Sequence, residues 1–202
     1  RTVQIVLIDT VIGLDDPSEY PNGDLLDPHV MSKAQAQWEW LDGQLSASTA
    51  DYLWVGGHYP VWSSCIHGPT SSLVKLLKPR LEAVGAHYMN GHDHCMGHYV
   101  ENGESVNYVL TGSGYECCYH PWLSFLIPHN ATKFLAAGTD GQAHQKLPVK
   151  LESGFVSLTF SQQSSKVTYY AQDGTALYTT PPIPPRSAYD KAAAAPRLRE
   201  AV

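Results

Sequence analysis

The sequence Ala86-His87-Tyr88-Met89 is followed by Asn90 and then by Gly91-His92-Asp93-His94, and this junction is the strongest indication of the fold. The first segment is apolar and typical of a β-strand, whereas the second begins with a glycine that is typical of a loop. His92 and His94 occupy positions i and i+2, so in an extended chain their side chains leave on the same face. Imidazole is the commonest side-chain ligand of transition metals. The pair therefore predicts half of a metal-coordination set at the end of a strand.

A second strand-like segment ends in the same way. Tyr52-Leu53-Trp54-Val55 is followed by Gly56-Gly57-His58-Tyr59-Pro60, which places another histidine just beyond a strand. Loops at the carboxyl ends of strands carry the sites of open α/β sheets, so we expect His58 to lie close to His92 and His94. A single histidine is more often solvated or hydrogen-bonded than bound to a metal. We give that ordinary role to the others apart from His67, namely His29, His87, His98, His120, His129 and His144.

The segments around these histidines resemble the second half of the purple acid phosphatases, most closely the small tartrate-resistant type. The likeness rests on Val55-Gly56-Gly57-His58-Tyr59-Pro60-Val61-Trp62-Ser63, on His67-Gly68-Pro69-Thr70 and on Gly91-His92-Asp93-His94, and it extends from about Val3 to about Thr179. The resemblance implies the α/β (α+β) fold of that family. In this fold the chain would form half of a four-layer αββα metallophosphatase sandwich.

The resemblance also implies a reaction and assigns roles to individual residues. It implies hydrolysis of phosphate monoesters at acidic pH by a binuclear metal centre of Fe(III) plus Fe(II), Zn or Mn. Such metals lower the pKa of water and neutralise the charge of the phosphate. By this resemblance His58 and His92 would hold the divalent metal, and His94 would hold the iron. His67 would be the catalytic residue that faces the phosphate.

Part of the expected metal shell is missing from the sequence. The first half of the family supplies an Asp, a bridging Asp with a nearby Tyr, and an Asn-His pair, and none of these motifs is present. Three neutral imidazoles cannot complete the shells of two cations, so we expect the chain alone not to hold a working dimetal centre. Asp93 and Tyr59 are expected beside the ligands, with Asp93 orienting an imidazole.

The expected partner is therefore the missing amino-terminal half of the domain, from the same or a separate chain. It would cover an unpaired edge or apolar face of the sheet that contains Val3–Ile8. The alternative is a catalytically silent metallophosphatase-fold subunit with a structural or interaction role. The two hypotheses differ in whether the upstream ligands are intact.

Composition excludes several other classes of protein. The 202 residues are 43% hydrophobic and 16% charged, which is typical of a soluble globular domain with one sizeable core. A net charge of -6 and the lack of a basic run before the tail argue against nucleic acid as a partner. No apolar stretch approaches the ~20 residues that span a bilayer. Asn130-Ala131-Thr132 is an acceptor for N-glycosylation. Together with the family resemblance it indicates a secreted, lysosomal or vacuolar protein.

The cysteines lack the spacing of a zinc finger. Cys117 and Cys118 are adjacent, and we expect them not to bond to each other, because neighbouring Cα atoms lie only ~3.8 Å apart. A bridge from one of them to Cys65, to Cys95 or to the missing half is expected instead.

The pattern along the chain indicates one domain over residues 1–180 and a Pro/Ala-rich, flexible or extended tail over residues 181–202. Gly13 to Pro28 is expected to be a long exposed loop. It resembles the loop over the active site in the tartrate-resistant phosphatases, and an ordinary surface loop is the alternative. Two helices are expected, at Met31–Leu45 and at Thr70–Val84, and Gly85 is expected to end the second. Strands are expected to begin near Val3 and Tyr88. Further strands are expected at Val106–Thr111, Gly154–Phe160, Lys166–Ala171 and Ala176–Thr179.

Overall fold

The computed structural model describes residues 1–12, 28–138, 147, 149–187 and 198. The loop predicted for Gly13 to Pro28 therefore lies, apart from its last residue, outside the described residues. In chain order the elements are β1 (Val3–Leu7), α1 (Pro28–Ala47), β2 (Tyr52–Gly56), α2 (Ser71–Val84), β3 (His87–Asn90), β4 (Met96–Tyr99), β5 (Tyr108–Thr111), the 3-10 helix η3 (Ser124–Leu126), β6 (Thr132–Ala136), β7 (Gly154–Phe160), β8 (Ser165–Ala171) and β9 (Ala176–Thr179).

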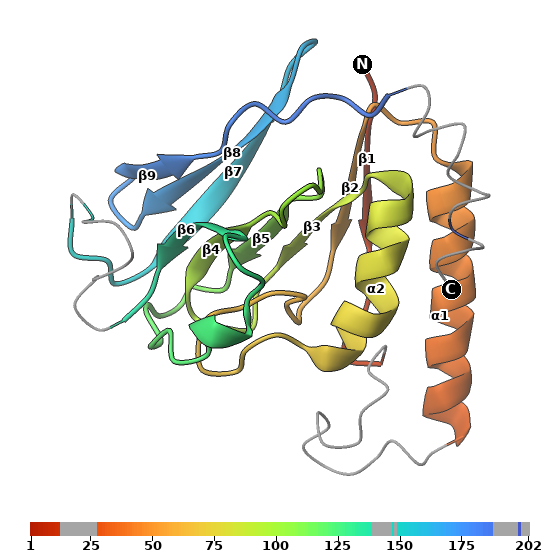
Figure 1. Cartoon of the computed structure of the whole chain (residues 1–202), viewed down its shortest axis with the longest axis horizontal. Helices are drawn as coiled ribbons and strands as arrows, with labels where there is room; N and C mark the ends of the chain where they lie inside the picture. The colour runs from red at the N-terminus through yellow and green to blue at the C-terminus, as the bar shows by residue number, and fades with distance from the viewer. Residues whose placement is uncertain (13–27, 139–146, 148, 188–197, 199–202) are drawn as a thin grey trace.

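Two sheets and a layer of helices make up the described fold (Figure 1). The larger sheet has six strands in the order β1-β2-β3-β5-β4-β6, where β1, β2, β3 and β5 are parallel and β4 is antiparallel to both of its neighbours. The smaller sheet is the antiparallel β7-β8-β9. Helices α1 and α2 lie on one face of the larger sheet and the smaller sheet lies on the other (Figure 1). The predicted mixed α/β class is confirmed.

Hydrophobic cores form on both faces of the larger sheet. On the helical side, Leu41 of α1 and Leu77 of α2 pack in one cluster with Val55. On the other side, Trp54 lies in a cluster with Tyr169 of the smaller sheet. Trp54 and Val55 are consecutive residues of β2, so their side chains point to opposite faces. Because both faces are covered, β2 is a continuous apolar run without polar alternation.

Helix α2 begins and ends where the sequence predicts. Thr70 is its N-cap residue in an extended conformation. Gly85 ends the helix with a left-handed φ of 65°, which glycine adopts without steric cost. Leu73, Leu77 and Leu81 recur at helical spacing and are fully buried, so one face of α2 is fixed against the sheet.

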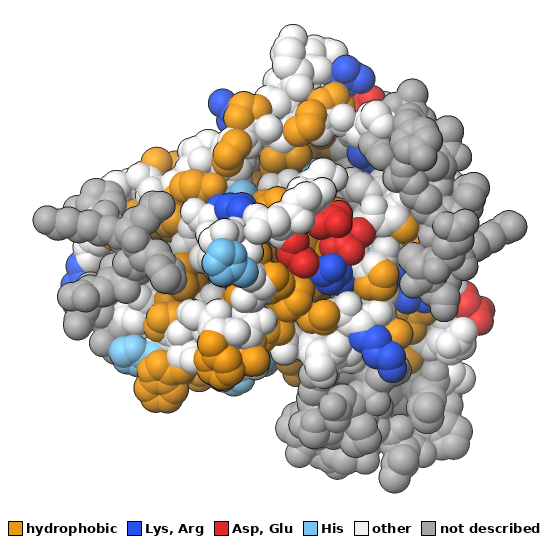
Figure 2. Space-filling view, in the orientation of Figure 1, with side chains coloured by type: hydrophobic (Ala, Val, Ile, Leu, Met, Phe, Trp, Pro, Cys, Tyr) orange, Lys and Arg blue, Asp and Glu red, His pale blue; other side chains and the backbone are white. Residues whose placement is uncertain are grey.

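A group of charges links α2 to the strands beside it. Figure 2 shows acidic side chains gathered beside a basic one on this face of the molecule. The Lys78 ammonium lies 2.8 Å from the carboxylate of Glu82 and 3.2 Å from that of Glu101, which follows β4. Tyr108 of β5 donates its hydroxyl to Glu82 at 3.3 Å. These contacts attach the helix to the sheet at its rim.

Strand β1 forms one edge of the larger sheet as far as the described residues extend. Its Val3, Ile5 and Leu7 side chains are 43%, 58% and 73% exposed. Beside them lies a groove of about 460 Å³ that also borders Trp54 and Leu158. The prediction of an open edge with an apolar face is confirmed. Surfaces of this kind are uncommon in monomeric soluble proteins.

The disulfides differ from the expectation. Cys65 bonds to Cys95, and Cys117 bonds to Cys118. The prediction that the adjacent cysteines do not bond to each other was wrong, as was the prediction of a bridge from one of them to a distant partner. The first prediction assumed the ~3.8 Å Cα spacing of a trans peptide. The peptide bond between Cys117 and Cys118 is cis, and their Cα atoms lie 3.0 Å apart.

The first part of the predicted tail is packed against the domain. Ile183 is buried and forms a β-bridge with Ser165. Arg186 is also buried, and its guanidinium donates to the carbonyl oxygens of Val84 at 2.8 Å and Ala50 at 3.3 Å. Of the two alternatives predicted for the tail, flexible or extended, residues 181–187 fit the extended one, because the buried guanidinium of Arg186 is bonded to the end of α2. Residues 188–197 and 199–202 lie outside the described residues.

Candidate functional site

His58 and His92 lie at the carboxyl ends of neighbouring parallel strands. β2 ends at Gly56 and the adjacent β3 ends at Asn90, so the loops that follow leave from the same edge of the sheet. The Nε2 atom of His58 lies 3.2 Å from Nδ1 of His92, and the two ring centroids are 5.0 Å apart. The expected convergence of these two side chains is confirmed, although 34 positions separate them in the sequence. Their role as metal ligands stays a prediction.

Backbone contacts hold these two loops together. The N–H of Gly91 donates to the carbonyl of His58 at 3.0 Å, and the N–H of Gly57 donates to the carbonyl of Met89 at 3.1 Å. A Cβ atom added at Gly57 would lie 2.5 Å from the Tyr88 hydroxyl. A side chain at position 57 would therefore displace the Tyr88 hydroxyl and the Thr10 side chain that supports the His58 loop.

Thr10 fixes the His58 loop from the side of β1. Its buried hydroxyl accepts hydrogen bonds from the backbone N–H groups of His58 at 3.0 Å and Tyr59 at 2.8 Å. The Tyr59 ring lies 4.3 Å from the His92 ring, so Tyr59 lies beside the candidate ligands. Thr10 was not among the predicted site residues. Its signal was its position directly after the opening strand, which ends at the same sheet edge as β2.

His67 and His94 join the same cluster. The His67 ring lies 4.4 Å from the His92 ring. Tyr119 lies between the outer histidines, with its ring stacked on His94 at 4.5 Å and 14° and its centroid 5.9 Å from that of His67. Tyr119 was not among the predicted site residues, because it lies in the irregular segment between β5 and η3, which carries no periodic signal.

Asp93 holds the loop that carries His67. One oxygen of its fully buried carboxylate accepts a hydrogen bond from the Ser63 hydroxyl, and the other accepts from the backbone N–H of His67 at 3.2 Å. We expected Asp93 to orient an imidazole ring, whereas its carboxylate is used by a hydroxyl and a backbone amide. The reason is that its side chain turns inward, under the loop. Gly112 packs on the other side of this turn, where an added Cβ would lie 1.9 Å from the Asp93 carbonyl oxygen.

The surroundings of His92 favour its neutral imidazole. Burial first, and then the neighbouring imidazoles of His67, His58 and His94 in that order, together lower the pKa of His92 to about 4. Each of these rings would carry a positive charge if it were protonated, so they disfavour protonation of His92. The neutral ring is the form that binds a metal ion.

Two of these imidazoles have the spacing that one metal ion requires. Two ~2.1 Å metal–nitrogen bonds whose ends lie 3.2 Å apart enclose an angle of about 100°, between octahedral and tetrahedral values. His94 offers a buried Nδ1 without a hydrogen bond in the described structure, 3.6 Å from the Glu116 carboxylate. Among the described residues, no group of three or more His, Cys, Asp or Glu side chains is placed to hold a metal ion. The imidazole nitrogens of His58, His92 and His94 therefore fit only part of the coordination shell of a metal centre.

The curated relatives of this chain are acid phosphatases. Human tartrate-resistant acid phosphatase type 5 is 33% identical over 180 residues, which are 89% of this chain and 52% of the relative. Purple acid phosphatase 4 of Arabidopsis thaliana is 31% identical over 139 residues, which are 68% of this chain and 36% of the relative. The chain is homologous to the purple acid phosphatases. It spans about half the length of the tartrate-resistant relatives. No protein-family model matches it.

A solved structure has the same fold. GAP50, described as the anchor in the inner membrane complex of Plasmodium, matches 99% of this chain and 55% of its own chain with a TM-score of 0.67 and 18% sequence identity. This match supports the fold class expected from the sequence. In the part of the chain that the structure describes, no helix has the length and apolar character needed to cross a membrane.

Proposed function

We propose that this chain is the carboxyl-terminal half of a binuclear metallophosphatase domain that hydrolyses phosphate monoesters at acidic pH. The observation that carries the proposal is the contact between His58 and His92, whose ring nitrogens lie 3.2 Å apart at the carboxyl ends of adjacent strands. Homology to acid phosphatases over 89% of the chain supports the same class of reaction.

The proposed metal roles divide the histidines into two groups. His58 and His92 would hold the divalent ion, Fe(II), Zn or Mn, because their nitrogens can share one metal. His94 would hold Fe(III) through its imidazole, and the remaining ligands would come from the amino-terminal half. When bound, the metals would lower the pKa of water and neutralise the phosphate charge. Tyr59 lies against the His92 ring and limits how that ring can turn.

His67 is the proposed catalytic residue outside the metal shell. Its ring lies beside His92, and its backbone is held by the buried Asp93 carboxylate. From this position its side chain would donate a hydrogen bond to the phosphate or to the leaving oxygen. A preorganised donor is effective because it need not reorganise as charge develops in the reaction.

The other half of the domain is proposed to pack on β1. The apolar groove beside β1 is lined by Ile5 and Leu7 and also by Gly57 and Gly91, which directly precede His58 and His92. A partner in this groove would therefore bring its own side chains to the imidazole cluster. Residues 1–180 are proposed as one structural unit with that partner, in a secreted, lysosomal or vacuolar protein.

The test is metal content and phosphatase turnover of the full-length protein. We expect His58→Ala and His92→Ala to lose the divalent metal and activity towards p-nitrophenyl phosphate. We expect His67→Ala to keep both metals and to slow turnover by about 10²–10⁴-fold. His120→Ala is the control, because His120 is exposed and stacks on Trp122 instead of joining the cluster. Loss of metal in His67→Ala would contradict its assignment.

A catalytically silent subunit is the second candidate. The described residues contain no complete group of metal ligands, which both candidates allow. The structural match to GAP50, described as an anchor, is compatible with such a role. Full-length protein that contains neither metal nor phosphatase activity after metal addition would support this candidate and contradict the enzyme.

A further inference from the structure

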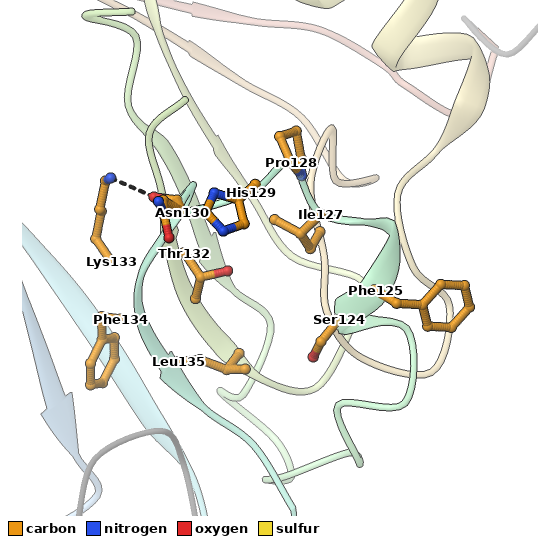
Figure 3. Close-up of a pocket in the computed structure, with 10 residues that line it drawn as sticks. All are labelled: Ser124, Phe125, Ile127, Pro128, His129, Asn130, Thr132, Lys133, Phe134 and Leu135. Atoms are coloured by element: carbon orange, nitrogen blue, oxygen red, sulfur yellow. Dashed lines mark hydrogen bonds between the residues drawn. The ribbon is translucent and has the colours of Figure 1, made fainter. Parts of the chain in front are cut away.

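A second cavity lies apart from the imidazole cluster, between η3 and β6 (Figure 3). Its volume is about 710 Å³, within the ~300–1,000 Å³ of sites that bind small molecules. Figure 3 shows His129, Asn130 and Thr132 at one end of this cavity and Ser124 and Phe125 at the other. The cavity has both polar and apolar walls, which suit an amphipathic occupant.

Asn130 stands at the edge of this cavity in a fixed turn. Its φ of 60° is left-handed, a conformation in which asparagine is enriched, and its side chain is exposed. Lys133 donates to the Asn130 carbonyl at 2.6 Å, and Asn102 donates to the preceding carbonyl of His129 at 3.2 Å. The backbone on both sides of the side chain is therefore tied down. The residue opens the only Asn-x-Ser/Thr triplet of the sequence, Asn130-Ala131-Thr132.

We infer that Asn130 carries an N-linked glycan whose first sugars occupy the cavity between η3 and β6. In the modification, the side-chain Nδ2 of Asn130 bonds to the anomeric carbon of an N-acetylglucosamine. The donor is an oligosaccharide attached to a lipid diphosphate. The bond from that carbon to the diphosphate oxygen breaks, the lipid diphosphate leaves with the electron pair, and Nδ2 loses one proton to a base of the transferase.

The cavity lining matches the surface of a sugar. The C–H faces and acetyl methyl groups would pack on Phe125 and Ile127, which removes apolar surface from water. The hydroxyl groups would face Thr132 and Lys133. The Lys133 ammonium has three donors and uses one on the Asn130 carbonyl, so donors remain for the glycan.

The glycan would also cover apolar surface that is otherwise exposed. Phe125 of η3, which lines the cavity, is 78% exposed. The amino-terminal half is proposed to pack on β1, which lies at the opposite edge of the larger sheet from β6. The inference therefore does not depend on the proposed phosphatase activity.

The test is expression of the full-length protein through a secretory pathway, followed by mass spectrometry and glycan release. We expect glycan mass on the peptide that contains Asn130, and none in Asn130→Asp, which keeps a short side chain suited to the left-handed turn. Thr132→Ser keeps the acceptor triplet and should keep the glycan. Peptide:N-glycosidase should release the glycan from the native protein at least about tenfold more slowly than from denatured protein, a factor equivalent to 1.4 kcal/mol.

Phe125→Ala should speed release from the native protein, because it removes a wall of the cavity. Phe155→Ala is the matched control, since Phe155 is 50% exposed on β7, away from this cavity. An unmodified Asn130 in the secreted protein would overturn the site. Equal release from native and denatured protein, or no effect of Phe125→Ala, would overturn the packing of the glycan in the cavity.

Discussion

Acidification should destabilise this domain through two buried histidines. His87 and His98 are 5% and 2% exposed, and burial lowers the pKa of His87 to about 3 and that of His98 to about 4. The His98 ring donates to the side-chain oxygen of Asn107 at 2.8 Å and accepts from the Tyr178 hydroxyl at 3.0 Å. His87 accepts from the backbone N–H of Asn107 at 3.1 Å. Both rings are bonded as neutral imidazoles.

The size of the effect follows from proton linkage. The unfolded chain takes up a proton on each histidine as the pH falls through the ordinary pKa of 6.5, whereas the folded protein does so only near pH 4 for His98 and pH 3 for His87. Stability is therefore full above pH 6.5 and is lost as the pH falls below it. Between pH 7 and pH 5 each histidine costs about 2 kcal/mol, or about 4 kcal/mol together.

Urea unfolding followed by tryptophan fluorescence at the two pH values measures this loss. Trp54 is a suitable probe, because its ring lies 4.9 Å from that of His87. His98→Gln cannot take up the proton, so its loss between pH 7 and pH 5 should be about 2 kcal/mol smaller than that of the unchanged protein. If both proteins lose the same free energy of unfolding, or neither loses any, the account of these buried histidines is refuted.

Three further predictions concern the loops and the open edge. Asp93→Asn should lower the turnover number while both metals stay bound, because the loop that carries His67 loses its hydrogen bond to the carboxylate. The measurement is the pH dependence of the rate of phosphate ester hydrolysis. A profile displaced from that of the unchanged enzyme would indicate loss of His67 positioning and not a general loss of stability. Cys65→Ser should cost about 2–4 kcal/mol in unfolding free energy, measured by urea titration, because it opens a loop that spans 30 residues to Cys95. Leu7→Lys should weaken binding of the amino-terminal half in a pull-down assay, since Leu7 is 73% exposed on β1; unchanged capture would place that half elsewhere.

Local signals in the sequence predicted much of the fold. Thr70 and Gly85 mark the ends of α2 by their backbone preferences, which depend on few neighbours. The antiparallel strands β7 and β8 alternate and are separated by a turn, so they were also found. By contrast, β4 and β6 were missed. Met96–Tyr99 is buried throughout and short, so it lacks the alternation that identifies a strand.

The candidate site was predicted only in part, because only some of its residues follow strands that the sequence marks. His58 and His92 follow strands that the sequence marks clearly, so their meeting could be expected from the parallel order. Ser63 and Tyr119 reach the site through loops, and contacts such as Ser63 to Asp93 across 30 positions leave no periodic signal. The bond between Cys117 and Cys118 was missed because nothing local in the sequence indicates a cis peptide.

The central claim is that His58 and His92 share one metal ion, and anomalous diffraction from crystals of the full-length protein tests it most directly. The account predicts an anomalous peak ~2.1 Å from Nε2 of His58 and from Nδ1 of His92, with a second peak, strongest at the iron edge, beside His94. A structure from metal-supplemented crystals in which these two nitrogens stay hydrogen-bonded to each other, with no peak between them, would contradict it.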